Sequence, residues 1–79
     1  MVFYVLTKVD WEFGRVYAEL YENELDAKNE MWNKAHWQNR IREGLSINML
    51  NDRHIVLEKR NGEEVQRIVE FTIEEKEVY

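Results

Sequence analysis

Residues 23–44 read NELDAKNEMWNKAHWQNRIREG and predict one long helix around which the rest of the chain is arranged. Asn23 suits the N-cap, and Gly44 suits the position just after the last turn. The helix is expected over residues 24–43. A stripe at helical spacing would face the core. It consists of Ala27, Met31, Ala35, Gln38, Ile41 and Leu45.

Two strands are expected before this helix. Residues 2–9 alternate with apolar side chains on both sides, which predicts an internal strand. Residues 10–14 form a loop, and residues 15–22 form the second strand. In that strand we expect Val16, Ala18 and Leu20 to face the core, with Tyr17, Glu19 and Tyr21 facing outward. A helix is the rival interpretation of residues 15–22, because Tyr17, Tyr21 and Leu25 are spaced four apart.

After the helix, residues 45–53 are expected to be a connection. Residues 54–60 and 63–74 alternate as strands, and Asn61-Gly62 between them predicts a two-residue type I′ hairpin. Residues 75–79 are expected to be a solvated tail.

The sequence therefore predicts a single α+β domain over residues 1–79, of order β-β-α-β-β. Two hairpins would form an antiparallel sheet, with the long amphipathic helix packed on one face. Met31 and Ala35 should be buried at the centre. Their expected contacts are Val5, Val16, Leu57 and Phe71.

Several stretches resemble a known group. They are residues 3–7 (FYVLT), 16–21 (VYAELY), 24–28 (ELDAK) and 71–75 (FTIEE). This pattern is similar to that of small uncharacterised ββα(β)β domains of bacteria and their phages. The chain departs from it in having Asn23 where serine is commoner, and in its longer helix. The resemblance implies the fold and no activity. In its acidic, cysteine-free, aromatic-rich character, the chain also resembles small phage proteins that inhibit host proteins.

Charge is distributed unevenly along the chain. Residues 10–30 carry seven acidic and two basic residues, residues 31–60 carry six basic and three acidic, and residues 61–79 carry six acidic and two basic. This layout predicts a bipolar molecule whose acidic face docks on a protein with a basic surface. An ordinary solvated surface is the alternative.

The leading functional hypothesis is therefore a protein-binding module, one form of which is a phage- or prophage-encoded inhibitor of a bacterial host protein. Exposed tryptophan and tyrosine would anchor the contact, and acidic residues would steer it. The expected contact residues are Asp10, Trp11, Glu12, Glu19, Tyr21, Glu22, Glu24, Asp26 and Trp37.

The alternative hypothesis is a small nucleic-acid-associated accessory protein. Arginines would contact phosphates, and tryptophan would stack on bases. This basic and aromatic patch would consist of His36, Trp37, Arg40, Arg42 and Arg53. A third hypothesis is a structural dimer joined through an edge strand, and both a monomer and a homodimer remain open.

The sequence contains little evidence of a catalytic site. The two histidines, His36 and His54, are not at metal-ligand spacing, and neither a glycine-rich phosphate loop nor a nucleophile motif is present in the sequence. We therefore expect no enzyme activity, no metal and no cofactor. The lack of cysteine fits a reducing compartment, here a bacterial cytoplasm. The apolar start, residues 1–6, is too short for a signal peptide or a membrane span.

Overall fold

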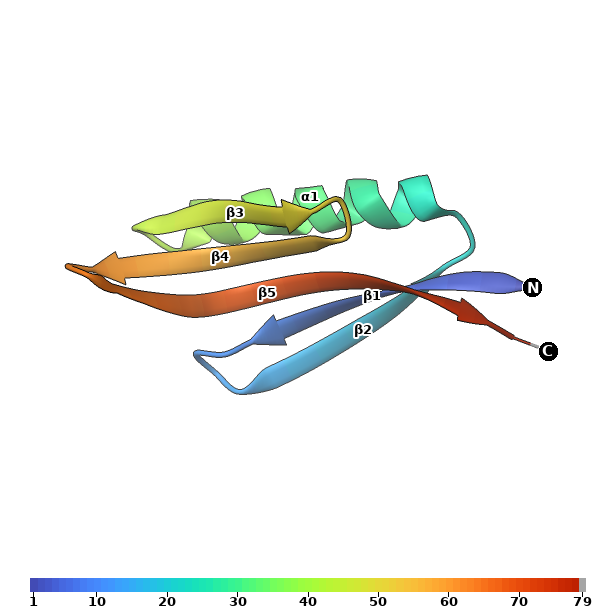
Figure 1. Ribbon diagram of the computed structural model, residues 1–79, viewed down its shortest axis with the longest axis horizontal. Coiled ribbons are helices and arrows are strands. Elements are labelled where there is room, and N and C mark those ends of the chain that lie inside the picture. Colours follow the sequence, from blue (N-terminus) through green and yellow to red (C-terminus); the bar gives the residue numbers. More distant parts are fainter. Residues whose placement is uncertain (79) are drawn as a thin grey trace.

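The computed structural model describes residues 1–78, and it confirms an α+β fold with one helix on an antiparallel sheet (Figure 1). The elements are β1 (Val2–Asp10), β2 (Arg15–Tyr21), α1 (Glu24–Ile41), β3 (Leu45–Asn51), β4 (His54–Asn61) and β5 (Glu64–Glu77). The sheet order is β2-β1-β5-β4-β3, with every neighbouring pair antiparallel. β2 and β3 are thus the two edges of the sheet.

Helix α1 begins where its cap predicts. The Asn23 side chain accepts hydrogen bonds from the backbone N–H groups of Leu25 (2.8 Å) and Asp26 (3.3 Å). These bonds satisfy two of the N–H groups that have no partner inside a helix. The helix ends at Ile41, two residues before the expected end, because Arg42 is already extended. Gly44 then takes a positive φ of 77° and turns the chain into β3.

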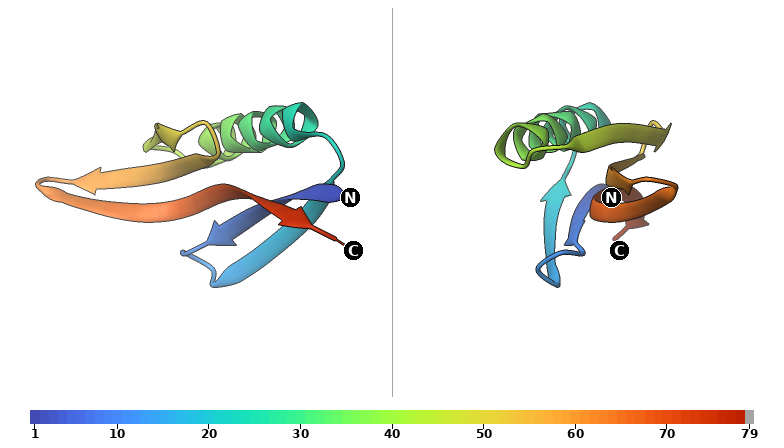
Figure 2. Two further views of the ribbon diagram at one scale, coloured as in Figure 1. Left: turned by 45° about the vertical axis from the view of Figure 1, so that its right-hand side comes forward. Right: turned by 90° about the vertical axis from the view of Figure 1, so that its left-hand side faces the viewer.

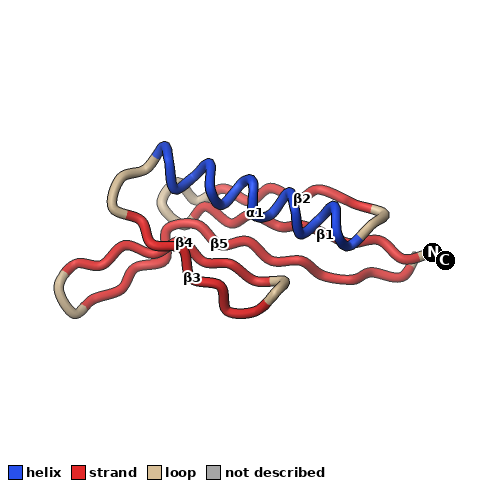
Figure 3. Tube along the Cα trace, turned by 90° about the horizontal axis from the view of Figure 1, so that it is seen from above, coloured by secondary structure: helices blue, strands red, loops and turns tan. Residues whose placement is uncertain are grey.

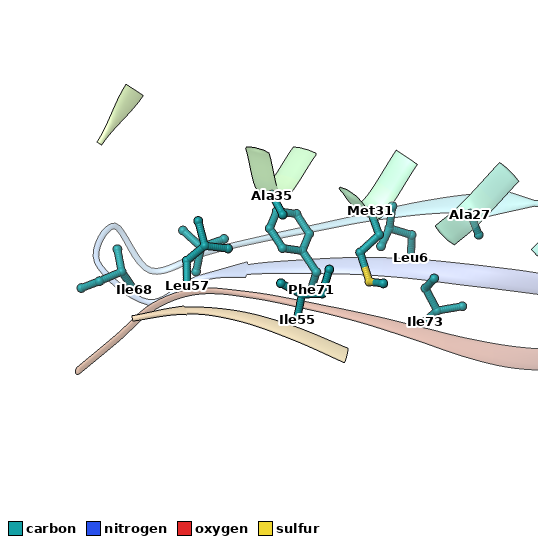
Figure 4. Packing of buried hydrophobic residues seen from close by; sticks show 10 residues of the cluster. Leu6, Ala27, Met31, Ala35, Ile55, Leu57, Ile68, Phe71 and Ile73 are labelled. Atoms are coloured by element: carbon teal, nitrogen blue, oxygen red, sulfur yellow. The ribbon is translucent and has the colours of Figure 1, made fainter. Parts of the chain in front are cut away.

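The core lies between α1 and one face of the sheet (Figure 4). Met31 and Ala35 are fully buried, and so are their expected contacts Leu57 and Phe71. The helix stripe is confirmed for Ala27 and Gln38, whereas Ile41 is exposed. Figure 4 shows the β4 and β5 side chains rising from the sheet toward Ala27, Met31 and Ala35.

The expected orientation of β2 is wrong. Tyr21 packs against the core, and Glu19 forms an ion pair with Lys34 of α1. Val16, Ala18 and Leu20 therefore lie on the opposite, helix-free face of the sheet. The same reversal removes Val5 from the core, because Val5 pairs with Leu20 in the β1–β2 register. Met31 and Ala35 are buried against Leu6 and not against Val5 or Val16.

Residues 45–53 contain a strand that we expected to be a connection. β3 pairs with β4 from Leu45↔Lys59 to Asn51↔His54, with one irregularity between Met49 and Asn51. At the other end of the sheet, residues 75–77 extend β5 opposite Val2–Tyr4. The side chains of residues 75–77 are exposed, as expected of a solvated tail, but their backbone is paired with β1, and residue 79 of the expected tail lies outside the described residues.

The β4–β5 hairpin has a two-residue turn, shifted by one position. Asn61 pairs with Glu64, so the central residues are Gly62 and Glu63. Gly62 has a φ of 67°, whereas Glu63 does not have a positive φ. A positive φ at the first central residue alone is the pattern of a type II′ turn, so the expected type I′ turn is wrong.

Candidate binding surface

The β1–β2 hairpin exposes an unusual amount of apolar surface. Val16 and Leu20 of β2 are 67% and 69% exposed, and Trp11 and Phe13 of the turn are 58% and 63% exposed. Ala18 lies between Val16 and Leu20 on the same strand face and is also exposed. We call these five residues, Trp11, Phe13, Val16, Ala18 and Leu20, the hairpin surface. In both views of Figure 2 the β1–β2 turn extends farther below α1 than any other segment.

A second apolar row lies beside the β2 residues. On β1, Val5, Thr7 and Val9 pair with Leu20, Ala18 and Val16. Because paired residues of an antiparallel sheet point to the same face, the two rows form one surface on the helix-free side. The β1 row is half-buried, whereas the β2 row is exposed. The edge strand therefore carries the most accessible part of this surface.

The turn at the end of the hairpin is held by a buried carboxylate. Asp10 is 4% exposed, and its Oδ1 accepts hydrogen bonds from the backbone N–H groups of Glu12 (3.1 Å) and Phe13 (3.0 Å). Its Oδ2 accepts a hydrogen bond from Arg42 Nη2 at 2.5 Å. Burial, the largest influence, raises the pKa of Asp10, but the bonds from Arg42 and Phe13 outweigh it and hold this pKa below its usual value.

Further bonds attach the turn to β5. The backbone N–H of Trp11 donates to the carbonyl of Ile68 (2.9 Å), and the indole Nε1 of Trp11 donates to Glu70 (3.2 Å). Glu70 also contacts His54 Nε2. Burial raises the pKa of Glu70, but the bonds from His54 and Trp11 leave it below its usual value. Trp11 thus keeps a fixed orientation while more than half of its surface faces solvent.

The two sheet edges differ. β2 pairs with β1 without a shift over its whole length, from Asp10↔Arg15 to Tyr4↔Tyr21. β3 has an irregularity between Met49 and Asn51, which bends a strand and interrupts its ladder. Figure 3 shows β2 behind α1 and β3 on the opposite side of the molecule. β2 is therefore the regular edge to which another strand can be added.

The acidic residues expected to bind a partner are largely engaged within the chain. Asp10 is buried, which corrects its assignment as a contact residue. Glu19 forms an ion pair with Lys34 (3.0 Å). Hydrogen bonds from Lys28 and Arg53 hold the pKa of Glu24 below its usual value. These three acidic residues of segment 10–30 are thus paired with Arg42, Lys34 and Arg53 of segment 31–60.

The remaining expected contact residues are spread over several places. Tyr21 is half-buried, and its hydroxyl donates to Glu19 at 2.6 Å. Glu12, Glu22 and Asp26 are exposed, and Trp37 is exposed on the outer side of α1. Of the nine expected contact residues, Trp11 alone belongs to the hairpin surface.

The expected nucleic-acid patch is divided. Arg42 is held by Asp10 near the C-terminal end of α1, whereas Arg53 contacts Glu24 at the N-terminal end. His36, Trp37 and Arg40 stay together and line a shallow hollow with Asn33 and Asn39. His36 also stacks on Trp32, with ring centroids 5.5 Å apart.

A smaller hollow of about 170 Å³ lies between the hairpin and α1. It is lined by Leu6, Lys8, Tyr17, Glu19 and Lys34. Its volume is below the roughly 300 Å³ at which pockets for drug-sized ligands begin. Within residues 1–78, the structure contains no group of three or more histidine or acidic side chains that could hold a metal ion. The helix of this described part does not have the apolar length of a membrane span.

The chain matches no protein-family model, and searches of curated proteins and of solved structures find no match. The resemblance to bacterial and phage ββα(β)β domains therefore stays a prediction.

The sequence contained a signal for the hairpin surface that our interpretation missed. Val16, Ala18 and Leu20 alternate with Tyr17, Glu19 and Tyr21, so both faces of β2 have apolar character. Hydrophobicity alone favours the aliphatic face as the core side. The tyrosines and Glu19 are the long side chains that can reach α1 from an edge strand, and they take the core side instead.

Proposed function

We propose that this chain is a protein-binding module and that its contact surface is the hairpin surface. The observation that carries this proposal is the exposure of Val16 and Leu20, 67% and 69%, on an unpaired and regular edge strand. Large apolar side chains grouped on one exposed face are typical of interaction sites. An open strand edge offers backbone hydrogen-bonding groups beside them.

The proposed contact is the addition of an extended strand to β2. Backbone hydrogen bonds would supply much of the affinity, and contacts with Val16, Ala18 and Leu20 would supply specificity. Trp11 and Phe13 would contact the same partner at the end of the hairpin, where aromatic side chains contribute strongly to binding. Glu22 and Asp26, which are exposed near the other end of β2, would favour a partner with basic residues there.

Inhibition of a bacterial host protein is one activity that such a contact would have. This activity is supported by the acidic, cysteine-free and aromatic-rich character of the chain, which resembles that of small phage proteins that inhibit host proteins. Binding through the hairpin surface does not depend on it.

The test compares capture by three immobilised proteins. These are the wild type, a Val16→Lys/Leu20→Lys variant, and a control Met49→Lys/Leu50→Lys variant with the same added charge on the other edge strand. Far-ultraviolet circular dichroism first establishes that all three are folded. The proteins offered are a bacterial lysate and, separately, free copies of this chain. We expect at least one protein from these two sources to be retained by the wild type and the control and lost from the hairpin variant. That protein is then purified and titrated against all three. Equal retention by all three would contradict the proposed surface.

A second candidate function, nucleic-acid binding, is favoured by the hollow that exposed Trp37 lines together with His36 and Arg40. Arg42 and Arg53 are engaged elsewhere, so this site is smaller than the sequence suggested. A gel shift with single- and double-stranded DNA and RNA at low salt tests it. A shift that disappears in a Trp37→Ala/Arg40→Ala variant, but not in the hairpin variant, would replace the protein-binding proposal.

A further inference from the structure

We infer that the partner of the hairpin surface is a second copy of this chain. β2 of one copy pairs antiparallel with β2 of the other, about a two-fold axis at Ala18. The inference rests on the proposed function, because it names the partner of the same surface. It joins two five-stranded sheets into one continuous sheet and leaves both α1 helices on the same face.

The helix-free side of β2 is complementary to itself in this register. With Ala18 opposite Ala18 of the second copy, Val16 lies opposite Leu20 of the second copy, and Leu20 opposite Val16. Every position on this side therefore pairs one apolar side chain with another. The smallest of the three, alanine, lies on the axis, where two identical side chains must fit against each other. Such directly opposed pairs are the units that stabilise a sheet.

The helix side of β2 is also compatible with this register. Arg15 lies opposite Tyr21 of the second copy and diagonal to its Glu19, at a separation that long side chains can bridge. Arg15 forms no ion pair within residues 1–78, so its charge is available for this contact. Tyr17 lies opposite Glu19 of the second copy. No two like charges are directly opposed, and the Glu19 charge is already balanced by Lys34.

The ends of the paired strands add a further contact. The same register brings the turn at Phe13 to the level of residue 23 of the second copy, at the start of its helix. Leu25, an exposed leucine in the first turn of α1, is close to that point in sequence. Phe13 is exposed, and its ring lies 5.1 Å from the Arg42 guanidinium on the helix side.

The other edge does not offer this symmetry. The irregularity between Met49 and Asn51 limits the regular ladder of β3 to residues 45–49, whereas β2 is regular over all seven of its residues. Seven residues of β2 in each copy are fewer than the roughly 20–30 residues per side of a standard interface. We therefore expect a reversible dimer that depends on protein concentration.

Because the chain has no cysteine, single cysteines test the register directly. Directly opposed residues of an antiparallel pair have Cα atoms about 4.5–5.5 Å apart, within the range that a disulfide spans. The variants are Ala18→Cys, Val16→Cys, Leu20→Cys and, as a control on the other edge strand, Ser46→Cys. Each purified protein is oxidised alone, and Val16→Cys is also oxidised together with Leu20→Cys.

We expect Ala18→Cys to form a covalent dimer at least about tenfold faster than Ser46→Cys, because strand pairing raises the effective concentration of the two thiols. The Val16→Cys and Leu20→Cys mixture should form mainly the heterodimer. In sedimentation equilibrium, Ala18→Lys should weaken the dimer of the cysteine-free protein at least about tenfold, since it places like charges in direct opposition, whereas Ser46→Lys should not.

Crosslinking of Ala18→Cys no faster than that of Ser46→Cys, or a wild type that stays monomeric up to about millimolar concentration, would overturn the inference. Preferred homodimers in the Val16→Cys and Leu20→Cys mixture would overturn the register. These experiments use the purified protein alone. If the chain does not dimerise but still captures another protein through the hairpin surface, the proposed function therefore stands and only the dimer inference is wrong. If it neither dimerises nor captures another protein, both proposals are wrong.

Discussion

Arg42, the residue after α1, donates a hydrogen bond of 2.5 Å to buried Asp10, the last residue of β1. The pair joins the C-terminal end of the helix to the β1–β2 turn. Asp10 also accepts two backbone N–H groups of that turn, so the geometry of Trp11 and Phe13 depends on it.

Replacing Asp10 should be costly. Asp10→Ala leaves the mostly buried Arg42 side chain and two turn N–H groups without their acceptor. We expect the free energy of unfolding to fall by about 2–4 kcal/mol in urea denaturation. Glu12→Ala removes only the longer, more exposed ion pair with Arg42 (3.9 Å) and should cost less than about 0.5 kcal/mol. Equal losses in the two variants would show that the Asp10 contacts do not stabilise the fold.

The same pair predicts a dependence on pH. The pKa of Asp10 is lower in the folded protein than in the unfolded chain, so its contribution is complete above the unfolded pKa of about 3.9. It is lost as the pH falls from there through the folded pKa. The stability difference between the wild type and Asp10→Asn should therefore shrink from pH 5 to pH 2. Thermal midpoints of both proteins over this range measure it. A difference that stays constant or grows toward low pH would be inconsistent with a lowered pKa.

The helix orientation gives a third prediction. Met31 is fully buried against the sheet, so Met31→Asp places a charge in the core without a partner. The variant should unfold or lose its cooperative thermal transition. Trp37→Asp introduces the same charge on the exposed side of α1 and should melt cooperatively, with a midpoint close to that of the wild type. A folded Met31→Asp variant would mean that α1 is turned the other way.

Much of this fold follows from local signals in the sequence. Asn23 caps the start of the helix, and the stripe of Ala27, Met31 and Ala35 gives its buried side, whereas the helix ends at Ile41, before the Gly44 signal. The face of β2 could not be assigned in this way, because a strand with tyrosine on one side and valine or leucine on the other is apolar on both. β3 was missed although Leu45, Ile47 and Met49 alternate, since adjacent Leu50 obscures the pattern.

The β4–β5 turn gives a fourth prediction. Gly62 has a φ of 67°, and a Cβ there would have no other atom within 4 Å, so a larger residue meets backbone strain but no clash. Gly62→Val should lower the free energy of unfolding by about 1–2 kcal/mol, because β-branched residues strongly disfavour positive φ. Gly62→Asn, which tolerates that region better, should lose less. Chemical denaturation of both measures the order, and a Val variant as stable as the Asn variant would contradict the turn geometry.

The candidate surface was harder to predict than the fold. The sequence shows that residues 10–30 are acidic but not that Lys34 and Arg42 fold back against Glu19 and Asp10. Those ion pairs are long-range contacts, and they exist because the β1–β2 hairpin lies beside α1. The acidic charge of residues 10–30 therefore does not predict where the hairpin surface lies. The apolar residues at an unpaired edge locate it, and they can be recognised once the strand order is known.

Amide hydrogen exchange measures the contact surface most directly. Peptides that cover residues 15–21 of β2, 45–51 of β3 and 33–40 of α1 are compared in dilute and concentrated protein, and with any captured partner. We predict slower exchange in residues 15–21 on association, because alternate amides of an edge strand have no partner until another strand is added. Residues 45–51 and 33–40 should not change. Slower exchange in either of those two segments, with residues 15–21 unchanged, would contradict binding through β2.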